Sequence, residues 1–484
     1  MLAPWVLDEL KAANLNDERL NKRFFELVDQ LAKRPTASIP AACGGAAETA
    51  AAYRWFDNEK VTFEKVLESH IESTRRRIAT QRKVMLVQDT TEVDVTRPEQ
   101  QVEGAGPLDG DTRRGALLHV LHAFAPDGIS LGTVHATVLV RSDEKPLNAT
   151  QTRAERQAIP IEDKESYRWV LTLRQAQAEA QRHPDTEFVC ITDSEGDIYE
   201  LLVEAAGGPR NAHYLVRACQ DRALLRDRTK KESPEELPDS LRAELLAAPA
   251  LYTTKISVRG RKAKVSCEDR GRRQPRKSRT AKVEVRAARV TFRPPGRPDR
   301  KLPPISMNAV IVRELSPPAG EPAVEWILLT DLSIDTTEQV REIVDSYCTR
   351  WLIEVFFRTL KSGCRVERRR FEHIDRLLPC LAVYLIVTWR TLYVCRLGRS
   401  CPDISCEAVF EPAEWRPVYR IVCDRQPPRK PPALQEMVVL IAQLGGYVKR
   451  KDPPGPQTVW LGLQRMHDFS LCWKMFGPGA EEAG

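Results

Sequence analysis

The spacing of apolar residues along the chain follows a helical period first, then a strand period, and then a helical period again. Near the amino terminus, apolar positions recur every three to four residues, and Asn16 and Asp17 can cap the helix that they form. Its apolar positions are Leu20, Phe24, Val28 and Leu31. The segments 46–56 and 63–77 continue the helical pattern, which predicts a helical domain over residues 1–78.

From residue 82 the pattern becomes that of strands. Short apolar runs at 83–88 and 187–192 stop at Asp89 and Asp193. The runs 115–124 and 129–140 flank Pro126-Asp127-Gly128, a turn signal that predicts an antiparallel hairpin. Helices are predicted at 165–181 and 197–206, and a further strand at 213–217. The order of three strands, helix, strand, helix and strand is that of a ribonuclease-H-like α/β core.

Residues 218–331 interrupt this core with β-rich pieces separated by Pro, Gly and Arg, which predicts an inserted β subdomain. A long helix follows Thr336, so the core domain is expected to span 79–371. Residues 372–484 are again helical in pattern and form the third predicted domain. Their longest apolar stretch, 377–395, is interrupted by Pro and Arg and lacks the run of about 20 apolar residues of a membrane-spanning helix, so we expect a buried helix.

Charge is distributed unevenly. The 74 Lys and Arg against 67 Asp and Glu give a net charge of only +7. Between Lys255 and Lys301, however, 18 basic residues face 4 acidic ones, which is +14 and leaves −7 for the rest of the chain. Such a segment points to a polyanion, most often nucleic acid, as partner. Arginines within alternating strands would share one face and suit a phosphate backbone better than a merely solvated basic loop.

Several classes of protein are disfavoured. The first residues carry acids where a signal peptide needs a basic and then an apolar region, so we expect a cytoplasmic protein without a membrane partner. The 12 cysteines are scattered without a C-x-x-C pair and are expected to be reduced. Neither a P-loop nor a G-x-G-x-x-G motif is present, so no nucleotide cofactor is expected.

Three acids are candidates for catalysis by their positions. Asp89 and Asp193 are predicted at the carboxyl ends of strands, and Glu354 lies on the long helix. At about 100° per residue, Glu354 shares a polar stripe of about 60° with Tyr347, Arg350 and Lys361. The neighbouring apolar stripe, predicted to pack on the sheet, consists of Val344, Cys348, Trp351 and Val355.

These acids suit phosphoryl transfer assisted by two metal ions. Three carboxylates make a hard oxygen site for a pair of Mg²⁺ ions, which activate an attacking oxygen and stabilise a leaving one. Flanking positive groups can hold the phosphate in line. An Asp that follows a strand is more often a cap or turn residue, so the prediction depends on the three acids together.

The spacing Tyr347-x2-Arg350-x3-Glu354-x6-Lys361 resembles the YREK signature of the DDE insertion-sequence transposases that cut and paste through a DNA hairpin. QDTT at 88–91 and TDSEGDIY at 192–199 resemble the first two acidic motifs of that family. Further similar blocks lie at 163–169, 214–217, 325–330 and 444–447, so the resemblance covers nearly the whole chain.

The resemblance implies roles for individual residues. Asp89, Asp193 and Glu354 would be the catalytic, metal-binding triad, with two Mg²⁺ ions that Mn²⁺ can replace. Tyr347, Arg350 and Lys361 would contact DNA phosphate near the cleaved end. Trp326 would stack on a base flipped out at the hairpin, although its position alone favours a core residue. Arg217 resembles a DNA-contacting arginine.

The resemblance also implies partners and a reaction. The amino-terminal helices would recognise the inverted-repeat ends of a transposon in double-stranded DNA, and the carboxyl-terminal helices would pair two protomers in a synaptic complex. The expected steps are nicking at the 3′ end, hairpin formation, hairpin opening and strand transfer into target DNA. Two alternatives stay open: a nuclease that cuts without joining, and a domesticated DNA-binding protein that has lost catalysis.

Overall fold

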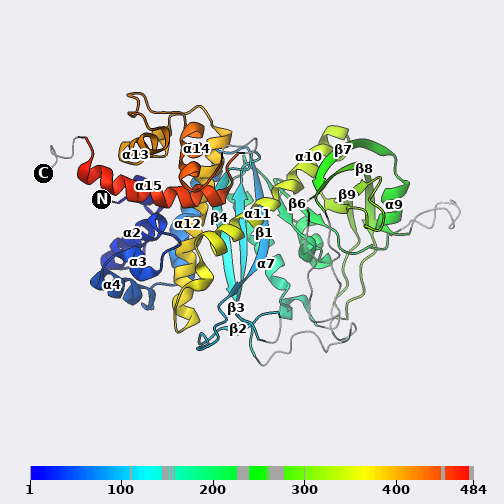
Figure 1. The fold of residues 1–484 in the computed structure, drawn as a ribbon. Coiled ribbons are helices and arrows are strands. Elements are labelled where there is room, and N and C mark those ends of the chain that lie inside the picture. The colour runs from blue at the N-terminus through cyan, green and yellow to red at the C-terminus, as the bar shows by residue number, and fades with distance from the viewer. Residues whose placement is uncertain are drawn as a thin grey trace, which may run out of the picture. The chain divides into compact units, whose positions relative to one another are not determined.

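A computed structural model of the chain describes residues 2–109, 112–143, 152, 155, 159–225, 239–258, 260, 277–298, 300–448 and 453–478. The chain forms two compact units (Figure 1). Unit 1 comprises Met1–Ala149 and Trp351–Gly484, and unit 2 comprises Thr150–Arg350. Each unit has its own strands and helices. One of the β-rich pieces expected within 218–331, at residues 262–267, lies outside the described residues together with much of the basic segment.

The amino-terminal part of unit 1 is helical, as predicted. Its helices are α1 (Pro4–Glu9), α2 (Glu18–Lys33), α3 (Ile39–Cys43), α4 (Ala46–Phe56) and α5 (Phe63–Ile78). Helix α2 begins where predicted, because the Asp17 carboxylate accepts hydrogen bonds from the amides of Arg19 at 2.9 Å and Leu20 at 3.3 Å. The helices pack through aromatic rings such as Phe24 and Trp55, whose centroids lie 5.5 Å apart.

The sheet of unit 1 is antiparallel. Strand β1 (Lys83–Asp94) pairs with β3 (Arg114–Phe124), which also pairs with β2 (Gly106–Pro107) and β4 (Ser130–Leu139). The predicted β3–β4 hairpin is confirmed, with Gly128 at a φ of 85° in its turn. The predicted end of the first strand is wrong. Strand β1 continues past Asp89 to Asp94, because its pairing with β3 extends to Gly115, so Asp89 lies inside a strand.

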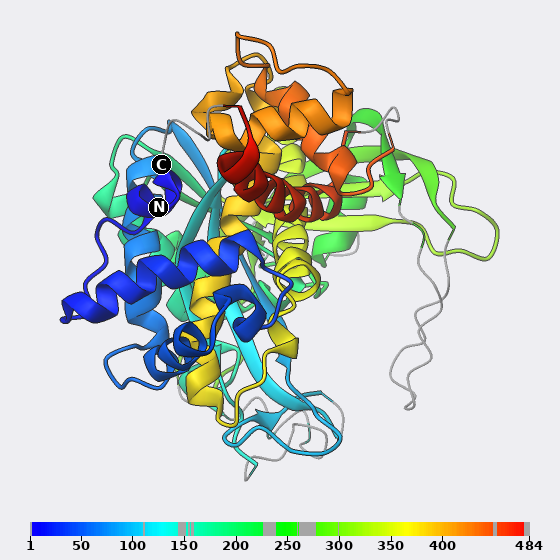
Figure 2. The same cartoon turned by 60° about the vertical axis from the view of Figure 1, so that its left-hand side comes forward.

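Helix α12 (Ile374–Ser400) is the core helix of unit 1. By length and composition it is apolar enough to cross a membrane, but 83% of its most apolar window is buried inside the protein. It packs against β4, against the amino-terminal helices α2, α4 and α5, and against two carboxyl-terminal helices, α14 (Leu434–Leu444) and α15 (Pro456–Phe476). Figure 2 shows it between these groups. The predicted buried helix is therefore confirmed.

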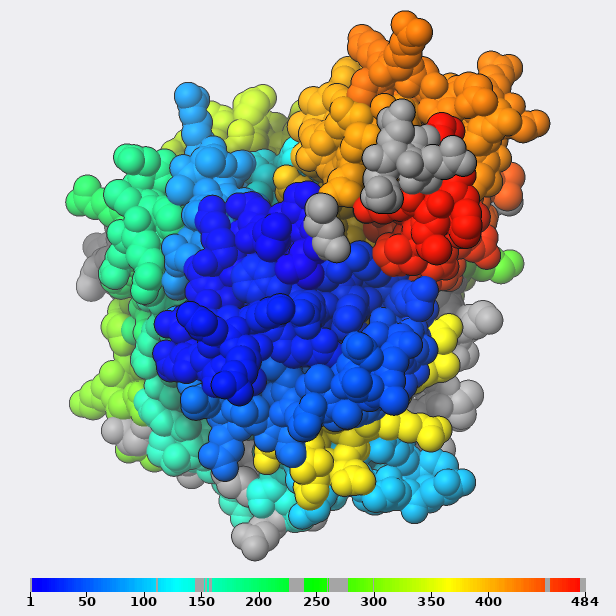
Figure 3. All heavy atoms as spheres, turned by 90° about the vertical axis from the view of Figure 1, so that its left-hand side faces the viewer, coloured from blue at the N-terminus to red at the C-terminus, as the bar shows by residue number. Residues whose placement is uncertain are grey.

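The carboxyl-terminal helices form their own apolar cluster at one end of α12. Helix α13 (Pro412–Cys423), the short η5 (Cys406–Ala408), α14 and α15 surround the fully buried Trp415. Helix α15 also contacts the amino-terminal helices, where Thr36 Oγ1 donates to Gln464 Oε1 at 3.2 Å. On the face shown in Figure 3, the amino-terminal residues (blue) and α15 (red) lie side by side.

The described strands of unit 2 form a mixed sheet in the order β5-β6-β10-β9-β8-β7. In it β5 and β6 pair in parallel, and the other described pairs are antiparallel. Its strands are β5 (Glu187–Thr192), β6 (Ala212–Arg217), β7 (Ala250–Val258), β8 (Arg279–Phe292), β9 (Ile305–Glu314) and β10 (Glu325–Thr330). Its helices are η1 (Ile161–Asp163), α7 (Tyr167–Arg182), η2 (Ser194–Gly196), α8 (Tyr199–Ala206), α9 (Leu241–Ala247) and α10 (Thr337–Thr349). Because β10 pairs with β6, the inserted strands extend the sheet of the core strands instead of forming a separate layer.

Many described arginines of the basic insertion are bound to acids. Arg279 lies 2.9 Å from Glu314, Arg297 lies 2.6 Å from Glu200, and Arg300 lies 2.7 Å from Glu162. Arg286 pairs with Glu284, and Arg289 pairs with Asp335. These pairs neutralise part of the local excess of positive charge. The described strands therefore offer less free charge to a polyanion than the composition predicted.

The predicted long helix is divided at Arg350. Helix α10 ends at Thr349, α11 (Trp351–Arg358) follows, and the chain continues as a π-helix, η3 (Thr359–Gly363), and a short 3-10 helix, η4 (Val366–Arg368). The predicted apolar stripe is wrong beyond Val344, since Cys348 is exposed and Trp351 is 44% exposed. The buried positions are instead Val340, Ile343, Val344 and Tyr347 in α10 and Ile353, Phe356 and Phe357 in α11.

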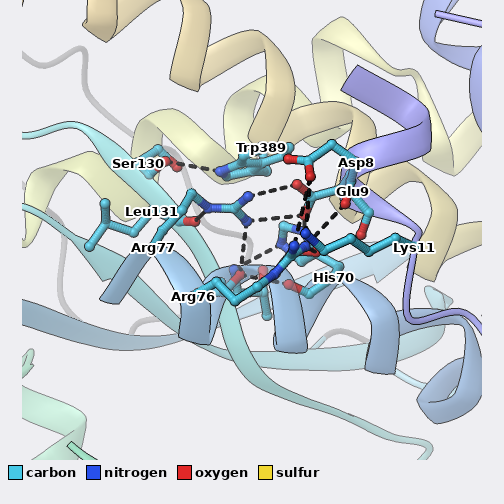
Figure 4. A network of polar contacts seen from close by, with 12 residues as sticks. Asp8, Glu9, Lys11, His70, Arg76, Arg77, Ser130, Leu131 and Trp389 are labelled. Carbon is cyan, nitrogen blue, oxygen red and sulfur yellow. Dashed lines mark hydrogen bonds and ion pairs between the residues drawn. The ribbon is translucent and has the colours of Figure 1, made fainter. Parts of the chain in front are cut away.

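A buried polar network joins α1 and α5 to β4 and α12 (Figure 4). The Glu9 carboxylate lies 2.7 Å from Arg77 Nη1 and 2.5 Å from His70 Nδ1. His70 Nε2 accepts a hydrogen bond from the amide of Thr133 at 3.0 Å, so the ring proton lies on Nδ1 and is donated to Glu9. The Arg77 guanidinium lies 4.1 Å from the Trp389 ring. The network thus requires a neutral His70.

We expect the protein to lose stability as the pH falls below about 6.5. Burial lowers the pKa of His70, His122 and His135, although Glu9 raises that of His70. Near pH 6.5 the histidines of the unfolded chain bind protons, whereas the buried histidines of the folded chain do not. The contribution of these neutral histidines to the free energy of unfolding is therefore complete above about pH 6.5, and it is lost as the pH falls toward their pKa values in the folded protein. The loss is at most about 1.4 kcal/mol per histidine and pH unit.

Urea unfolding at pH 7.5, 6.5 and 5.5 measures this effect. The midpoint should fall between pH 6.5 and 5.5 at nearly constant slope. The His122 ring contacts the hydroxyls of Ser130 and Thr133. The variant His122→Gln should therefore keep polar contacts and reduce the pH dependence. A midpoint that does not change over this range would contradict the account.

Candidate active site

Asp193 immediately follows β5, as predicted, and begins the 3-10 turn η2. Its carboxylate Oδ1 accepts a hydrogen bond from the amide of Glu195 at 2.8 Å, which fixes the side chain at the end of the strand. The next residue, Ser194, accepts a hydrogen bond from Arg217 Nη2 at 3.1 Å. Arg217 ends β6, the parallel neighbour of β5, so the adjacent strand ends bring Asp193 and Arg217 to the same region.

Unit 2 gathers further predicted residues around Tyr347. This side chain is only 6% exposed, and its ring centroid lies 6.1 Å from that of Trp326. Burial raises the pKa of the Tyr347 hydroxyl, Arg217 and Arg350 oppose the rise, and Asp193 adds to it. The Tyr347 phenol therefore lies close enough to Arg217, Arg350 and Asp193 for their charges to shift its pKa.

Trp326 is only partly buried, at the start of β10. The residues that follow it on this strand, Leu328 and Leu329, are fully buried. The alternative that Trp326 is an ordinary core residue is therefore weakened, because the residue is not fully buried. A partly exposed indole beside a tyrosine ring has an aromatic face that can stack on a nucleic-acid base.

The remaining predicted site residues belong to unit 1. Asp89 is 9% exposed in the middle of β1, and its Oδ1 accepts a hydrogen bond from the amide of Thr90 at 2.8 Å. Helix α11 packs against β1 and carries Glu354 on its exposed side, while Ile353 and Phe356 are buried. Unit 1 thus supplies two of the three proposed acids from elements that contact each other.

Lys361 lies in the π-helix η3. Helices of this kind are rare in proteins, and those that occur are often found at functional sites. Its Nζ is 3.5 Å from Glu367, which also accepts a hydrogen bond from the amide of Asp94 at 3.1 Å. Glu367 therefore connects Lys361 to the end of β1. The sequence did not predict the contact between Glu367 and Lys361, because a spacing of six residues does not bring two side chains together on a regular helix.

Other acids near the proposed triad have structural roles. Asp197, which a sequence reading would leave solvated, is 3% exposed and accepts hydrogen bonds from the amides of Cys219 at 2.9 Å and Gln220 at 3.2 Å. Arg222 also pairs with it at 2.5 Å. Arg113 bridges Glu92 and Asp94. Asp197, Glu92 and Asp94 are therefore held by basic side chains or main-chain amides.

The donor chemistry of the three candidates fits Mg²⁺, which prefers oxygen ligands from a small number of carboxylates. Among the residues that the structure describes, no group of three or more Cys, His, Asp or Glu side chains lies close enough together to hold a metal ion. Of the three candidate ligands, Asp89 and Glu354 belong to unit 1, and Asp193 belongs to unit 2.

Three family models match successive parts of the chain. Residues 3–61 match the transposase DNA-binding family, residues 181–378 the transposase DDE domain, and residues 386–475 the Tn5 transposase dimerisation domain. The DDE match implies the ribonuclease-H-like core that the order of strands and helices predicted. Among solved structures, the synaptic complex of piggyBac transposase with hairpin DNA aligns at 10% identity and a TM-score of 0.31. That alignment covers 69% of this chain and about half (51%) of the other.

Proposed function

This chain belongs to the DDE transposases of insertion sequences, and we propose that it excises and inserts DNA by cut-and-paste transposition. The observation that carries the proposal is the succession of a DNA-binding, a DDE and a dimerisation match along one chain. A DNA-binding protein without catalysis needs no complete set of carboxylates, whereas Asp89, Asp193 and Glu354 are all present. A protein that acts on DNA in this way is expected to be cytoplasmic.

We propose Asp89, Asp193 and Glu354 as the ligands of two divalent ions, Mg²⁺ or Mn²⁺. The ions, when bound, would activate an attacking oxygen and stabilise the leaving one. The chain itself holds the substrate. Arg217, Arg350 and Lys361 would supply positive charge for DNA phosphates near the cleaved end. Their fixed positions, Arg217 on Ser194 and Lys361 beside Glu367, reduce the entropy lost when DNA binds.

The proposed reaction is a series of in-line attacks on phosphodiester bonds. Water first cleaves one strand at the transposon end and leaves a 3′-OH. That hydroxyl attacks the opposite strand to give a hairpin and releases the flanking DNA. A second water opens the hairpin, and the 3′-OH then attacks target DNA. Trp326 would receive the base that must leave the stack when the strand bends into the hairpin.

Two protomers are proposed to act together, each on one inverted-repeat end. The match to a dimerisation family over residues 386–475 supports this arrangement. In the described part of that region, α13 and α15 expose apolar side chains such as Ile421, Met475 and Phe476, which are 48%, 66% and 80% exposed. A second copy of the chain would cover them.

The direct test is cleavage of labelled DNA that carries the inverted repeats flanking the gene. Purified protein with Mg²⁺ should nick the end, then form a hairpin and open it, and the products should be absent when EDTA is added. Binding without cleavage in Mg²⁺ and in Mn²⁺ would favour the domesticated DNA-binding alternative. Nicking without a hairpin would favour a simple nuclease.

A further inference from the structure

A run of three arginines, Arg368 to Arg370, follows Lys361 in unit 1, and only the middle one is buried. Arg369 is 4% exposed, while Arg368 and Arg370 are exposed. Three consecutive arginines normally form a solvated basic surface, and a guanidinium is almost never fully buried unless it is paired. The burial of Arg369 therefore needs a structural reason.

Main-chain carbonyls surround the Arg369 guanidinium. Nη2 donates to the carbonyl of Pro35 at 2.5 Å and to that of Cys364, and Nη1 donates to the carbonyl of Ala37. Its carbon Cζ lies 4.5 Å from the ring centroid of Tyr384, a cation–π contact. In the part of the chain that the structure describes, no carboxylate forms an ion pair with it.

These carbonyls belong to two different functional regions. Pro35 and Ala37 lie in the link between α2 and α3, inside the match to the transposase DNA-binding family. Cys364 directly follows η3, the π-helix that carries Lys361. A planar guanidinium donates in a fixed fork, so it can satisfy these carbonyls only when the two segments hold one relative position. Lysine, a single ammonium on a flexible stem, would not impose that geometry.

Neighbouring contacts strengthen the same connection. Phe371 packs edge-on against Phe56 and Tyr53 of α4, with ring centroids 5.5 Å and 5.8 Å apart. Arg97, which follows β1, donates to the carbonyls of Arg369 at 2.7 Å and Phe371 at 3.0 Å. Figure 3 shows this part of the chain (yellow) against the amino-terminal residues (blue). The segment from Val366 to Phe371 thus joins the DNA-binding helices to η3.

We propose that Arg369 is a positioning residue that couples the end-binding helices to Lys361 and Glu354. This inference rests on the proposed transposase function. When the amino-terminal helices hold a transposon end, Arg369 fixes η3, and through it Lys361 and the helix of Glu354, at the position required for cleavage. Without Arg369 the end would still bind, but the bound DNA would be cleaved slowly, because small displacements of positioning groups cost up to about 100-fold in rate.

The test separates end binding from cleavage. For Arg369→Met in the full-length protein, we expect an end-DNA Kd within about threefold of wild type and a single-turnover nicking rate, at saturating protein, lower by about 10- to 100-fold. Arg369→Lys should recover little of the rate. Arg368→Met is the matched control, since it removes the same charge from an exposed neighbour and should leave the nicking rate of bound DNA within about threefold.

A purely structural role predicts another pattern. If Arg369 only stabilised the fold, Arg369→Met would reduce the folded fraction, and binding and cleavage would fall in the same proportion, with an unchanged rate per bound complex. That outcome, or a wild-type nicking rate, would overturn the inference. If Arg369→Met does not fold, Phe371→Leu provides the same test, because it keeps apolar bulk but removes the edge-on contacts with Tyr53 and Phe56.

Failure of this inference is distinguishable from failure of the proposed function. If wild-type protein does not cleave end DNA in Mg²⁺, the function itself is wrong. If wild type cleaves and Arg369→Met cleaves equally well, only the coupling role of Arg369 is wrong.

Discussion

Asp193→Ala is expected to abolish Mg²⁺-dependent cleavage of end DNA while end binding persists. The carboxylate lies at the end of β5, fixed by the amide of Glu195, and we propose it as a ligand of the divalent ions. Metal ions contribute several kcal/mol of transition-state stabilisation. At about 1.4 kcal/mol per tenfold change in rate, their loss corresponds to at least about a thousandfold. Single-turnover cleavage of labelled DNA and a gel-shift Kd measure the two quantities.

Glu195→Gln is the matched control for Asp193→Ala. Glu195 lies two residues further on the same turn, its side chain is 60% exposed, and it pairs with Arg168 at 3.1 Å. An exposed ion pair of this kind contributes little to stability, so the variant should fold and cleave nearly as wild type does. Unchanged cleavage by Asp193→Ala, or an equal loss in both variants, would remove Asp193 from the proposed triad.

Trp326→Ala is expected to impair hairpin formation more than first-strand nicking. The indole is partly exposed beside Tyr347, and stacking on a flipped base is worth about 1–3 kcal/mol, or about 5- to 150-fold in rate. Nicking needs no such base, so its rate should change little. Denaturing gels that resolve nicked and hairpin products over time give both rate constants.

A conservative variant distinguishes stacking from packing at this position. Trp326→Phe keeps an aromatic face and should recover much of the hairpin rate. If Trp326→Ala instead slows nicking and hairpin formation equally, and lowers the midpoint of urea unfolding, the side chain is a packing residue of the β10–α10 contact and not a stacking platform.

Local signals in the sequence predicted local structure well. Asp17 caps α2 because a carboxylate needs only the next few amides, and Pro126-Asp127-Gly128 turns the β3–β4 hairpin because glycine accepts a positive φ. Strand β5 begins and ends at its predicted residues, since an apolar run bounded by Asp193 depends little on distant partners. Asp193 and Arg217 could therefore each be placed at the end of a strand from the sequence, whereas the pairing of these strands is seen only in the structure.

Other features depend on partners that are distant in sequence. The end of β1 was predicted at Asp89, but pairing with β3 extends the strand to Asp94. A constant 100° per residue placed Tyr347 and Glu354 on one helix, whereas the helix is divided at Arg350 and Tyr347 is buried. The burial of Arg369 depends on carbonyls more than 300 residues away (sequence separations of 334 and 332), which no periodicity can indicate.

Strand transfer is the measurement that tests the central proposal most directly. Wild-type protein, DNA carrying both inverted-repeat ends, a supercoiled target plasmid and Mg²⁺ are incubated together, and the products are sequenced. We expect junctions in which the 3′ end of the element is joined to target DNA, and we expect none with Asp193→Ala. Cleaved ends that never become joined to the target would contradict the proposal and identify the protein as a nuclease.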